Sequence, residues 1–263
     1  MPKILIFIGP PGSGKGTQAK KFAGKLNYGH ISTGDLLRAL ASDNDIAPDE
    51  KAAIEEMKEG KLVPDWLIYR LVFREIEKYL AKGQGVVLDG AIRNLEQAKE
   101  YQKFFEDKNL GQEVLAVEIS LTDDESFNRL TKRRMCESCG EIIPWLASTK
   151  NLTVCPKCNG RLITRPDDEE KVIKERIIEQ GNTALKPILD YYLALKILKR
   201  VDGMKDIDGV EKEIERDSDA ELFFHPGHPG EGRRTGELKP DVGACQREEY
   251  IGEGQQHSIQ MPV

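Results

Sequence analysis

Apolar residues gather in short uninterrupted runs that predict buried β-strands. Such strands are predicted at KILIFIG, residues 3–9, GVVLD, 85–89, and VLAVEIS, 114–120, and residues 197–201 could form a last short strand. Strands that are apolar at every position are typical of parallel sheets covered on both faces. Because helical patterns separate the runs, we predict an α/β fold with three layers and right-handed crossovers.

Several helices can be placed from periodicity and from the residues at their ends. We expect helices over Gly16–Leu26 and Asp123–Arg134, and a helical insert that contains STGDLLRAL at 32–40 and a second run from Pro48 to about Gly60. Pro166 is followed by four acidic residues, 167–170, and this pattern predicts another helix start. Proline fits the first helical position, and carboxylates in the first turn complement the helix dipole.

The charge divides the chain into a neutral body and an acidic end. The net charge is −6, and the residues from Glu211 onward, with 12 acidic and 6 basic side chains, account for all of it. From about Asp217 apolar periodicity gives way to Gly, Pro, Glu and Gln, so we predict one domain at 1–216 and a disordered acidic tail at 217–263. A neutral body gives no support to a general nucleic-acid binder.

The apolar runs are too short to span a membrane. The run at the start leads into a glycine-rich turn rather than a signal-peptide cleavage site. We therefore expect a soluble, cytoplasmic protein with neither a membrane nor a nucleic acid as partner. In that reducing compartment cysteines are better suited to metal ligation than to disulfides.

Residues 9–17, GPPGSGKGT, have the pattern of a phosphate-binding loop between a predicted strand and a predicted helix. Glycines let the backbone curl around a phosphate, N–H groups of the loop and the helix N-terminus face it, and Lys15 adds a positive charge. Thr17, or a water held near it, can assist Mg²⁺. The pattern predicts binding of nucleotide phosphates and by itself names no reaction.

Five further segments occur in an order and spacing that resemble the adenylate kinase family. They read STGDLLR at 32–38, KLVPD at 61–65, LDGAIRNLEQA at 88–98, RLTKRR at 129–134 and RPDDEEKVIKER at 165–176. The resemblance covers residues 1 to about 210. It implies a P-loop NTPase fold and a monomer that moves a phosphoryl group reversibly from MgATP to AMP. It also implies an AMP-binding insert at about 32–63 and an ATP-covering lid at about 132–165.

The resemblance implies site residues as well. The phosphates in transfer would be held by Lys15, Arg93, Arg133, Arg165 and Arg176. ATP would contact Gly12, Ser13, Gly14, Lys15, Gly16, Thr17, Arg129, Arg133, Ile142, Ile143 and Lys205. AMP would contact Thr33, Arg38, Lys61, Leu62, Val63, Gly90, Ala91, Ile92, Arg93, Gln97, Arg165 and Arg176.

The chemistry of the residues agrees with these implied roles. Two polyanions must meet in line, so the site needs bidentate cationic donors, and an anionic acceptor phosphate needs no strong general base. Arg93 and Gln97 are four residues apart and are expected on one face of a helix, as are Arg129 and Arg133. Asp89 ends an apolar run, where its carboxylate can hold the water shell of Mg²⁺ together with Thr17.

One dipeptide departs from the family pattern. Ala91-Ile92 stands where the family usually carries Phe-Pro, which removes an aromatic ring and a rigid turn beside the predicted AMP site. The rest of that motif is in place, so we expect altered AMP affinity rather than lost activity. A kinase acting on UMP, CMP or GMP is therefore an open alternative.

Four cysteines form two C-x2-C pairs that are fifteen residues apart: Cys136, Cys139, Cys155 and Cys158. This is zinc-ribbon spacing, suited to a closed tetrahedral structural Zn²⁺. Two disulfides or a redox pair are the alternatives, which the reducing compartment and the sequence context disfavour. By the resemblance, zinc would stabilise the lid. A nucleotide switch with a nucleic-acid-binding ribbon is a further alternative, but only one aromatic residue and two lysines lie between the outer cysteines.

Overall fold

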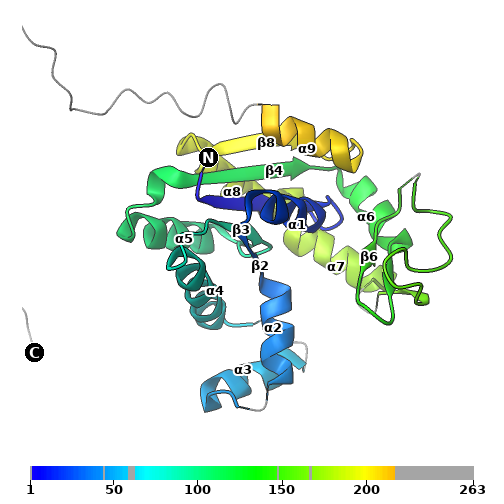
Figure 1. Cartoon of the computed structure of the whole chain (residues 1–263), viewed down its shortest axis with the longest axis horizontal. Helices are drawn as coiled ribbons and strands as arrows, with labels where there is room; N and C mark the ends of the chain where they lie inside the picture. The colour runs from blue at the N-terminus through cyan, green and yellow to red at the C-terminus, as the bar shows by residue number, and fades with distance from the viewer. Residues whose placement is uncertain (1, 44, 59–62, 147, 166–167, 217–263) are drawn as a thin grey trace, which may run out of the picture. The chain divides into compact units, whose positions relative to one another are not determined.

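The computed structural model describes residues 2–43, 45–58, 63–146, 148–165 and 168–216. Its main sheet has five parallel strands in the order β2-β3-β1-β4-β8 (Figure 1). The parallel sheet with flanking helices confirms the predicted fold class. The strands span β1 Ile4–Ile8, β2 Gly29–Ser32, β3 Val86–Asp89, β4 Val114–Ser120 and β8 Leu198–Asp202.

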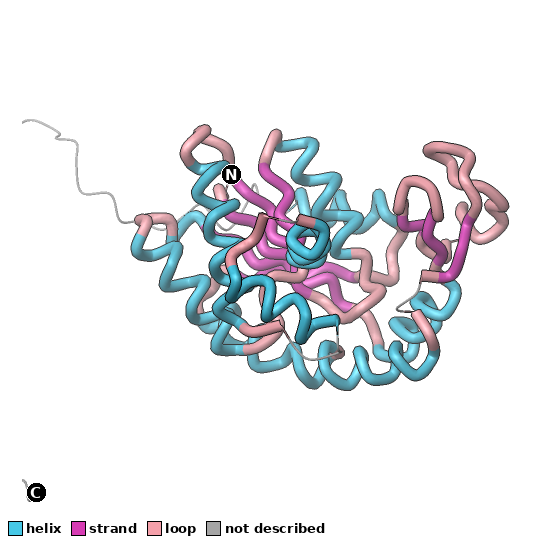
Figure 2. The backbone as a smooth tube through the Cα atoms, turned by 90° about the horizontal axis from the view of Figure 1, so that it is seen from below, coloured by secondary structure: helices cyan, strands magenta, loops and turns pink. Residues whose placement is uncertain are grey.

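Helices cover both faces of this sheet, which explains why β1 is apolar at every position and β3 at all but its last. Along β1, Ile4, Ile6 and Ile8 pack into one hydrophobic cluster while Leu5 and Phe7 pack into another. Figure 2 shows the strands of the main sheet between helices. Buried residues of α4 Asp65–Leu80, α5 Leu95–Asp107 and α8 Asn182–Ala194 belong to the first cluster. Buried residues of α1 Lys15–Leu26 and α9 Ile207–Arg216 belong to the second.

Two smaller parts are inserted between elements of the three-layer body. The first follows β2 and is helical, as predicted, with α2 Thr33–Ser42 and α3 Pro48–Lys58. The second holds a three-stranded antiparallel sheet in the order β6-β5-β7. The remaining elements are η1 Gly111–Glu113, α6 Asp123–Lys132, β5 Arg134–Cys136, β6 Ile142–Ile143, β7 Leu162–Thr164 and α7 Glu170–Gln180.

The structure corrects three expectations about local elements. Strand β2 has no counterpart among the predicted strands, and α6 ends at Lys132 rather than Arg134 because Arg134 pairs in β5. The helix expected to open at Pro166 begins at Glu170, with Glu169 as its N-cap. Asp168 therefore precedes the helix, and its carboxylate is used in a buried ion pair rather than in a first helical turn.

Some predictions fall on parts of the chain that the structure does not describe. The acidic tail at 217–263 lies outside the described residues, and so do Lys61 and Leu62 of the predicted AMP site. The domain boundaries stay predictions. Among the helices that are described, none has the length and apolar character that crossing a membrane requires.

Candidate active site and cysteine cluster

The turn between β1 and α1 has the backbone of a phosphate-binding loop. Gly12 and Gly14 have φ angles of 81° and 93°, in the left-handed region that favours glycine. Gly14 is also the N-cap of α1, so the helix N-terminus opens directly from the loop. Ser126 of α6 donates a hydrogen bond of 2.5 Å to the carbonyl of Pro11 and ties the loop to the body.

Lys15 folds back across this loop. Its Nζ donates to the carbonyl oxygens of Gly9 at 3.1 Å and Pro10 at 3.2 Å. Burial lowers the pKa of Lys15 to about 8, and the carboxylate of Asp89 opposes this shift. A half-buried ammonium that donates to uncharged carbonyl oxygens is suited to receive the charge of a phosphate.

Three arginines that are distant in sequence approach Lys15 closely enough to lower its pKa further: Arg93, Arg133 and Arg176. Asp168 joins two of them, since Nε and Nη2 of Arg133 both lie 2.6 Å from its oxygens and Nη1 of Arg176 lies 3.4 Å away. The Asp168 side chain is fully buried. It offsets the repulsion between the two guanidinium groups and fixes Arg133 with bidentate geometry.

Asp168 is a residue that the sequence interpretation missed. The run Pro166–Glu170 reads as a helix start, and that pattern accounts for each acid without a specific partner. The available signal was its place in the RPDDEEKVIKER segment, between two arginines that were themselves assigned to the phosphates.

Asp89 ends β3 beside the first turn of α1. A Cβ placed on Gly16 would lie 2.9 Å from Asp89 Oδ2, so the carboxylate lies directly against the helix start that carries Thr17. His30 Nε2 lies 3.7 Å from the same oxygen. A hydroxyl and a carboxylate this close to the phosphate loop are oxygen ligands of the kind that Mg²⁺ binds, directly or through water.

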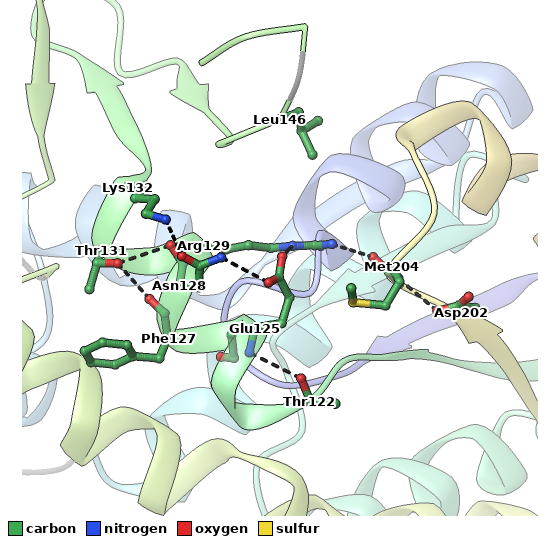
Figure 3. Close-up of polar contacts among 12 residues, drawn as sticks. Thr122, Glu125, Phe127, Asn128, Arg129, Thr131, Lys132, Leu146, Asp202 and Met204 are labelled. Carbon is green, nitrogen blue, oxygen red and sulfur yellow. Dashed lines mark hydrogen bonds and ion pairs between the residues drawn. The ribbon is translucent and has the colours of Figure 1, made fainter. Parts of the chain in front are cut away.

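Arg129 crosses from α6 to the loop after β8 (Figure 3). Its Nε donates to Glu125 Oε1 and its Nη2 to the carbonyl of Gly203, both at 2.9 Å. Figure 3 also shows Leu146 beside this guanidinium group, on the side of the inserted sheet. The two hydrogen bonds hold a flat, charged surface of the kind on which a base can stack.

Arg129 and Arg133 do not share a helical face, contrary to expectation. Arg133 is the C-cap of α6 and has an extended backbone, so its side chain leaves the helix and reaches Asp168. Arg129 stays in the helix and bonds to Glu125 one turn earlier. The two arginines therefore have different partners.

Arg93 and Gln97 also differ from the expected arrangement. Asn94 is the N-cap of α5, so Arg93 precedes the helix. The two residues are nevertheless joined, because the backbone N–H of Arg93 donates to Gln97 Oε1 at 2.7 Å. Gln97 Nε2 donates in turn to Asp65 Oδ1 of α4 at 2.7 Å.

A cleft brings most of the predicted site residues together. Of the predicted nucleotide-binding residues that are described, the exceptions are Thr33, Val63, Ala91 and Gln97, and all of these except Val63 are buried. Three lining residues were not predicted: Asp35, Trp145 and Leu146. Asp35 accepts a hydrogen bond of 2.5 Å from Arg38. The predicted residues in the lining are Gly12, Ser13, Gly14, Lys15, Gly16, Thr17, Arg38, Asp89, Gly90, Ile92, Arg93, Arg129, Arg133, Ile142, Ile143, Arg165, Arg176 and Lys205.

The four cysteines converge in the inserted antiparallel part. Their sulfur atoms all lie within 4.8 Å of one another, with Cys136–Cys158 at 3.4 Å and Cys139–Cys155 at 3.7 Å. A disulfide needs about 2.05 Å between sulfurs, whereas four ligands at about 2.3 Å from a tetrahedral ion stand about 3.8 Å apart. The geometry therefore fits a tetrahedral metal site.

Comparison with known proteins gives a consistent result. A family model described as adenylate kinase matches residues 7–197. The chain is 40% identical to the adenylate kinase of Borrelia turicatae over 211 residues. This matched segment covers 80% of this chain and 96% of the relative. It is also 40% identical over 215 residues to the adenylate kinases of Archaeoglobus fulgidus (80% of this chain, 95% of the relative) and Caldanaerobacter subterraneus (81% and 94%).

Proposed function

Since the chain belongs to the adenylate kinase family, we propose that it transfers the γ-phosphoryl group of ATP reversibly to AMP, giving two ADP. The observation that carries this proposal is the convergence of Lys15 with Arg93, Arg133 and Arg176 beside the phosphate loop. Two polyanions can approach each other in line only where such dispersed positive charge offsets their repulsion.

The roles of these residues follow from their chemistry. An oxygen of the AMP phosphate attacks the γ-phosphorus, and the bond from that phosphorus to the β,γ-bridging oxygen breaks as ADP leaves. Lys15 and the loop N–H groups hold the β- and γ-phosphates, and Arg133 and Arg176 face the group in transfer. Arg165 and Arg93 complete the clamp from the lid side and the AMP side. Thr17 and Asp89 would hold the water shell of a Mg²⁺ ion, which would neutralise charge on the phosphates of ATP.

The base of ATP is assigned to the surface formed by Arg129. The guanidinium plane, fixed by Glu125 and Gly203, offers a stacking face, and Ile142, Ile143 and Lys205 line the same cleft. AMP is assigned to the side of the insert, with Arg38 and Gly90–Arg93 in the lining and Gln97 bonded behind Arg93. Movement of the insert and the lid over the substrates would exclude water.

The cysteine cluster is assigned a structural role. Four thiolates without an open position suit Zn²⁺, which would hold an inserted segment with three short strands of its own. We assign the enzyme to the cytoplasm as a monomer, with ATP and AMP as its partners and neither nucleic acid nor membrane among them.

The proposal is tested by incubating purified protein with ATP, Mg²⁺ and each of AMP, GMP, CMP and UMP, and following diphosphate formation in both directions. Reversible ADP formation with AMP as the preferred acceptor is expected. A strong preference for another acceptor would replace AMP in the proposal and would make Ala91-Ile92 the first place to look for the cause. ATP binding without transfer to any acceptor would refute the proposal and favour a nucleotide switch.

A further inference from the structure

Both ends of the Gln97 side-chain amide are held by groups of opposite hydrogen-bonding character. The backbone N–H of Arg93 donates to Oε1, and Asp65 Oδ1 accepts from Nε2, each at 2.7 Å. Gln97 is 4% exposed, and its own backbone N–H is capped by Asn94 Oδ1 at 2.7 Å. Neither the backbone nor the side chain of this residue is free to reorient independently.

These contacts fix which way the amide faces. A backbone N–H can only donate and an ionised carboxylate can only accept, whereas a glutamine amide offers an oxygen and an NH2 of nearly equal shape. Rotating the amide by half a turn would set NH2 against the N–H of Arg93 and oxygen against the carboxylate of Asp65. Both hydrogen bonds would be lost, and each would be replaced by a repulsive contact.

Aromatic side chains connect the helix that carries Asp65 to the helix that carries Gln97. Asp65 is the first residue of α4, and one turn later the ring of Tyr69 meets Tyr101 of α5 edge-on, with centroids 6.0 Å apart. Phe73 meets Tyr101 in the same manner at 5.0 Å. Asp65 therefore lies at the start of a helix whose next two turns contact α5 through aromatic rings.

We propose that Asp65 is a positioning residue that selects the acceptor base by fixing the orientation of the Gln97 amide. An amide can donate twice and accept twice, so the two contacts described leave one donor on Nε2 beside one acceptor on Oε1. Adenine presents the complementary edge, an amino donor beside a ring-nitrogen acceptor, and cytosine presents the same order. Hypoxanthine, guanine and uracil present a keto acceptor beside an N–H donor. They match only the rotated amide, which the N–H of Arg93 and the carboxylate of Asp65 exclude.

The inference rests on the proposed AMP kinase activity and on a contact between the acceptor base and Gln97, which is buried outside the cleft lining. It is tested by comparing AMP with IMP, which differ only at this edge of the base. For the wild-type protein we expect kcat/KM for AMP to exceed that for IMP by on the order of 100-fold or more. In Asp65→Asn the new amide can donate to a rotated Gln97 as well as accept from the native one. The ratio should then fall by about tenfold, through a higher KM for AMP and a lower KM for IMP.

Two further variants complete the test. Asp65→Ala removes the hydrogen-bond acceptor of Gln97 and should also lower the AMP:IMP ratio of kcat/KM. Asp49→Asn is the control, because it removes a carboxylate charge that pairs with Arg70 of α4 at 2.8 Å, and it should leave this ratio unchanged. Because both substrates are compared on one preparation, the ratio does not depend on the fraction of active protein. Calorimetric titration of AMP and IMP gives the same comparison without turnover.

The two hypotheses fail in different ways. A wild-type protein that does not phosphorylate AMP refutes the proposed function. A wild-type protein that does so, with AMP:IMP ratios that stay within about twofold in both Asp65 variants, refutes the orientation role and leaves the function standing.

Discussion

Asp168 supports the arginine cluster, and Asp168→Asn keeps its shape while removing its charge. The carboxylate is fully buried, and both of its oxygens lie within 2.6 Å of the Arg133 guanidinium group, with Arg176 at 3.4 Å. Removing one partner of a buried ion pair costs about 3–5 kcal/mol. Since 14% of the Arg133 side chain and 24% of the Arg176 side chain remain exposed to solvent, we place the loss of unfolding free energy near the lower end, at about 3 kcal/mol.

The assay is thermal and urea unfolding with and without saturating ATP. A loss of about 3 kcal/mol corresponds to a fall in Tm of about 6–12 °C for a domain of this size. ATP should narrow the gap between the variant and the wild-type protein, because its phosphates provide the negative charge that the two arginines have lost. Transfer activity should fall mainly in kcat.

A matched surface substitution provides the control for this prediction. Asp190→Asn breaks an exposed ion pair with Lys186 one helical turn away, at 2.6 Å, and should cost less than about 0.5 kcal/mol. If Asp168→Asn unfolds at the same temperature as Asp190→Asn, the carboxylate does not stabilise the cluster as argued. If ATP leaves the gap unchanged, phosphates do not bind at Arg133 and Arg176.

Three further predictions concern other parts of the site. Cys139→Ser or a strong chelator should release about one zinc per chain and lower Tm by several degrees; metal analysis that finds no zinc, with an unchanged Tm, would contradict this. Burial lowers the pKa of Lys15 to about 8, so its positive charge is lost as pH rises through that value. ATP affinity should therefore weaken above about pH 8, and Lys15→Met should remove this pH dependence. If ATP affinity falls equally with pH in both proteins, Lys15 is not the titrating group. Glu125→Ala should raise KM for ATP severalfold and leave KM for AMP unchanged, since the Glu125 carboxylate holds Arg129 and its neighbour Asn128 and contacts no residue assigned to AMP. Parallel changes in both constants would indicate a general structural role.

Features of the site that depend on residues close in sequence could be predicted from the sequence. The phosphate loop needs glycines at the left-handed positions and a lysine at the helix start, all within one nonapeptide, and GPPGSGKGT meets that need. The sulfur ligands converge as predicted because each C-x2-C pair spans a single turn. The apolar pattern did not predict strand β2, because the strand has only four residues and three of them are glycine, histidine and serine.

Two predictions of a shared helical face failed, one because of a helix cap and one because of a residue distant in sequence. Asn94 caps α5 and thereby excludes Arg93 from the helix that would have carried it on the same face as Gln97. Arg133 leaves α6 at the C-cap because Asp168, 35 residues later, accepts its guanidinium group. In the first case a local capping contact took precedence over helical spacing, and in the second a tertiary ion pair did.

By itself, the sequence determined the covered parallel sheet, the phosphate loop and the four-sulfur cluster, because apolar runs and ligand spacing express those features over a few residues. Only the tertiary structure decided which carboxylate holds which cation, and that Asp65, 32 residues before Gln97, controls the direction of its amide. Such pairings depend on distances across the fold of a few ångströms, which helix packing sets and which no local pattern encodes.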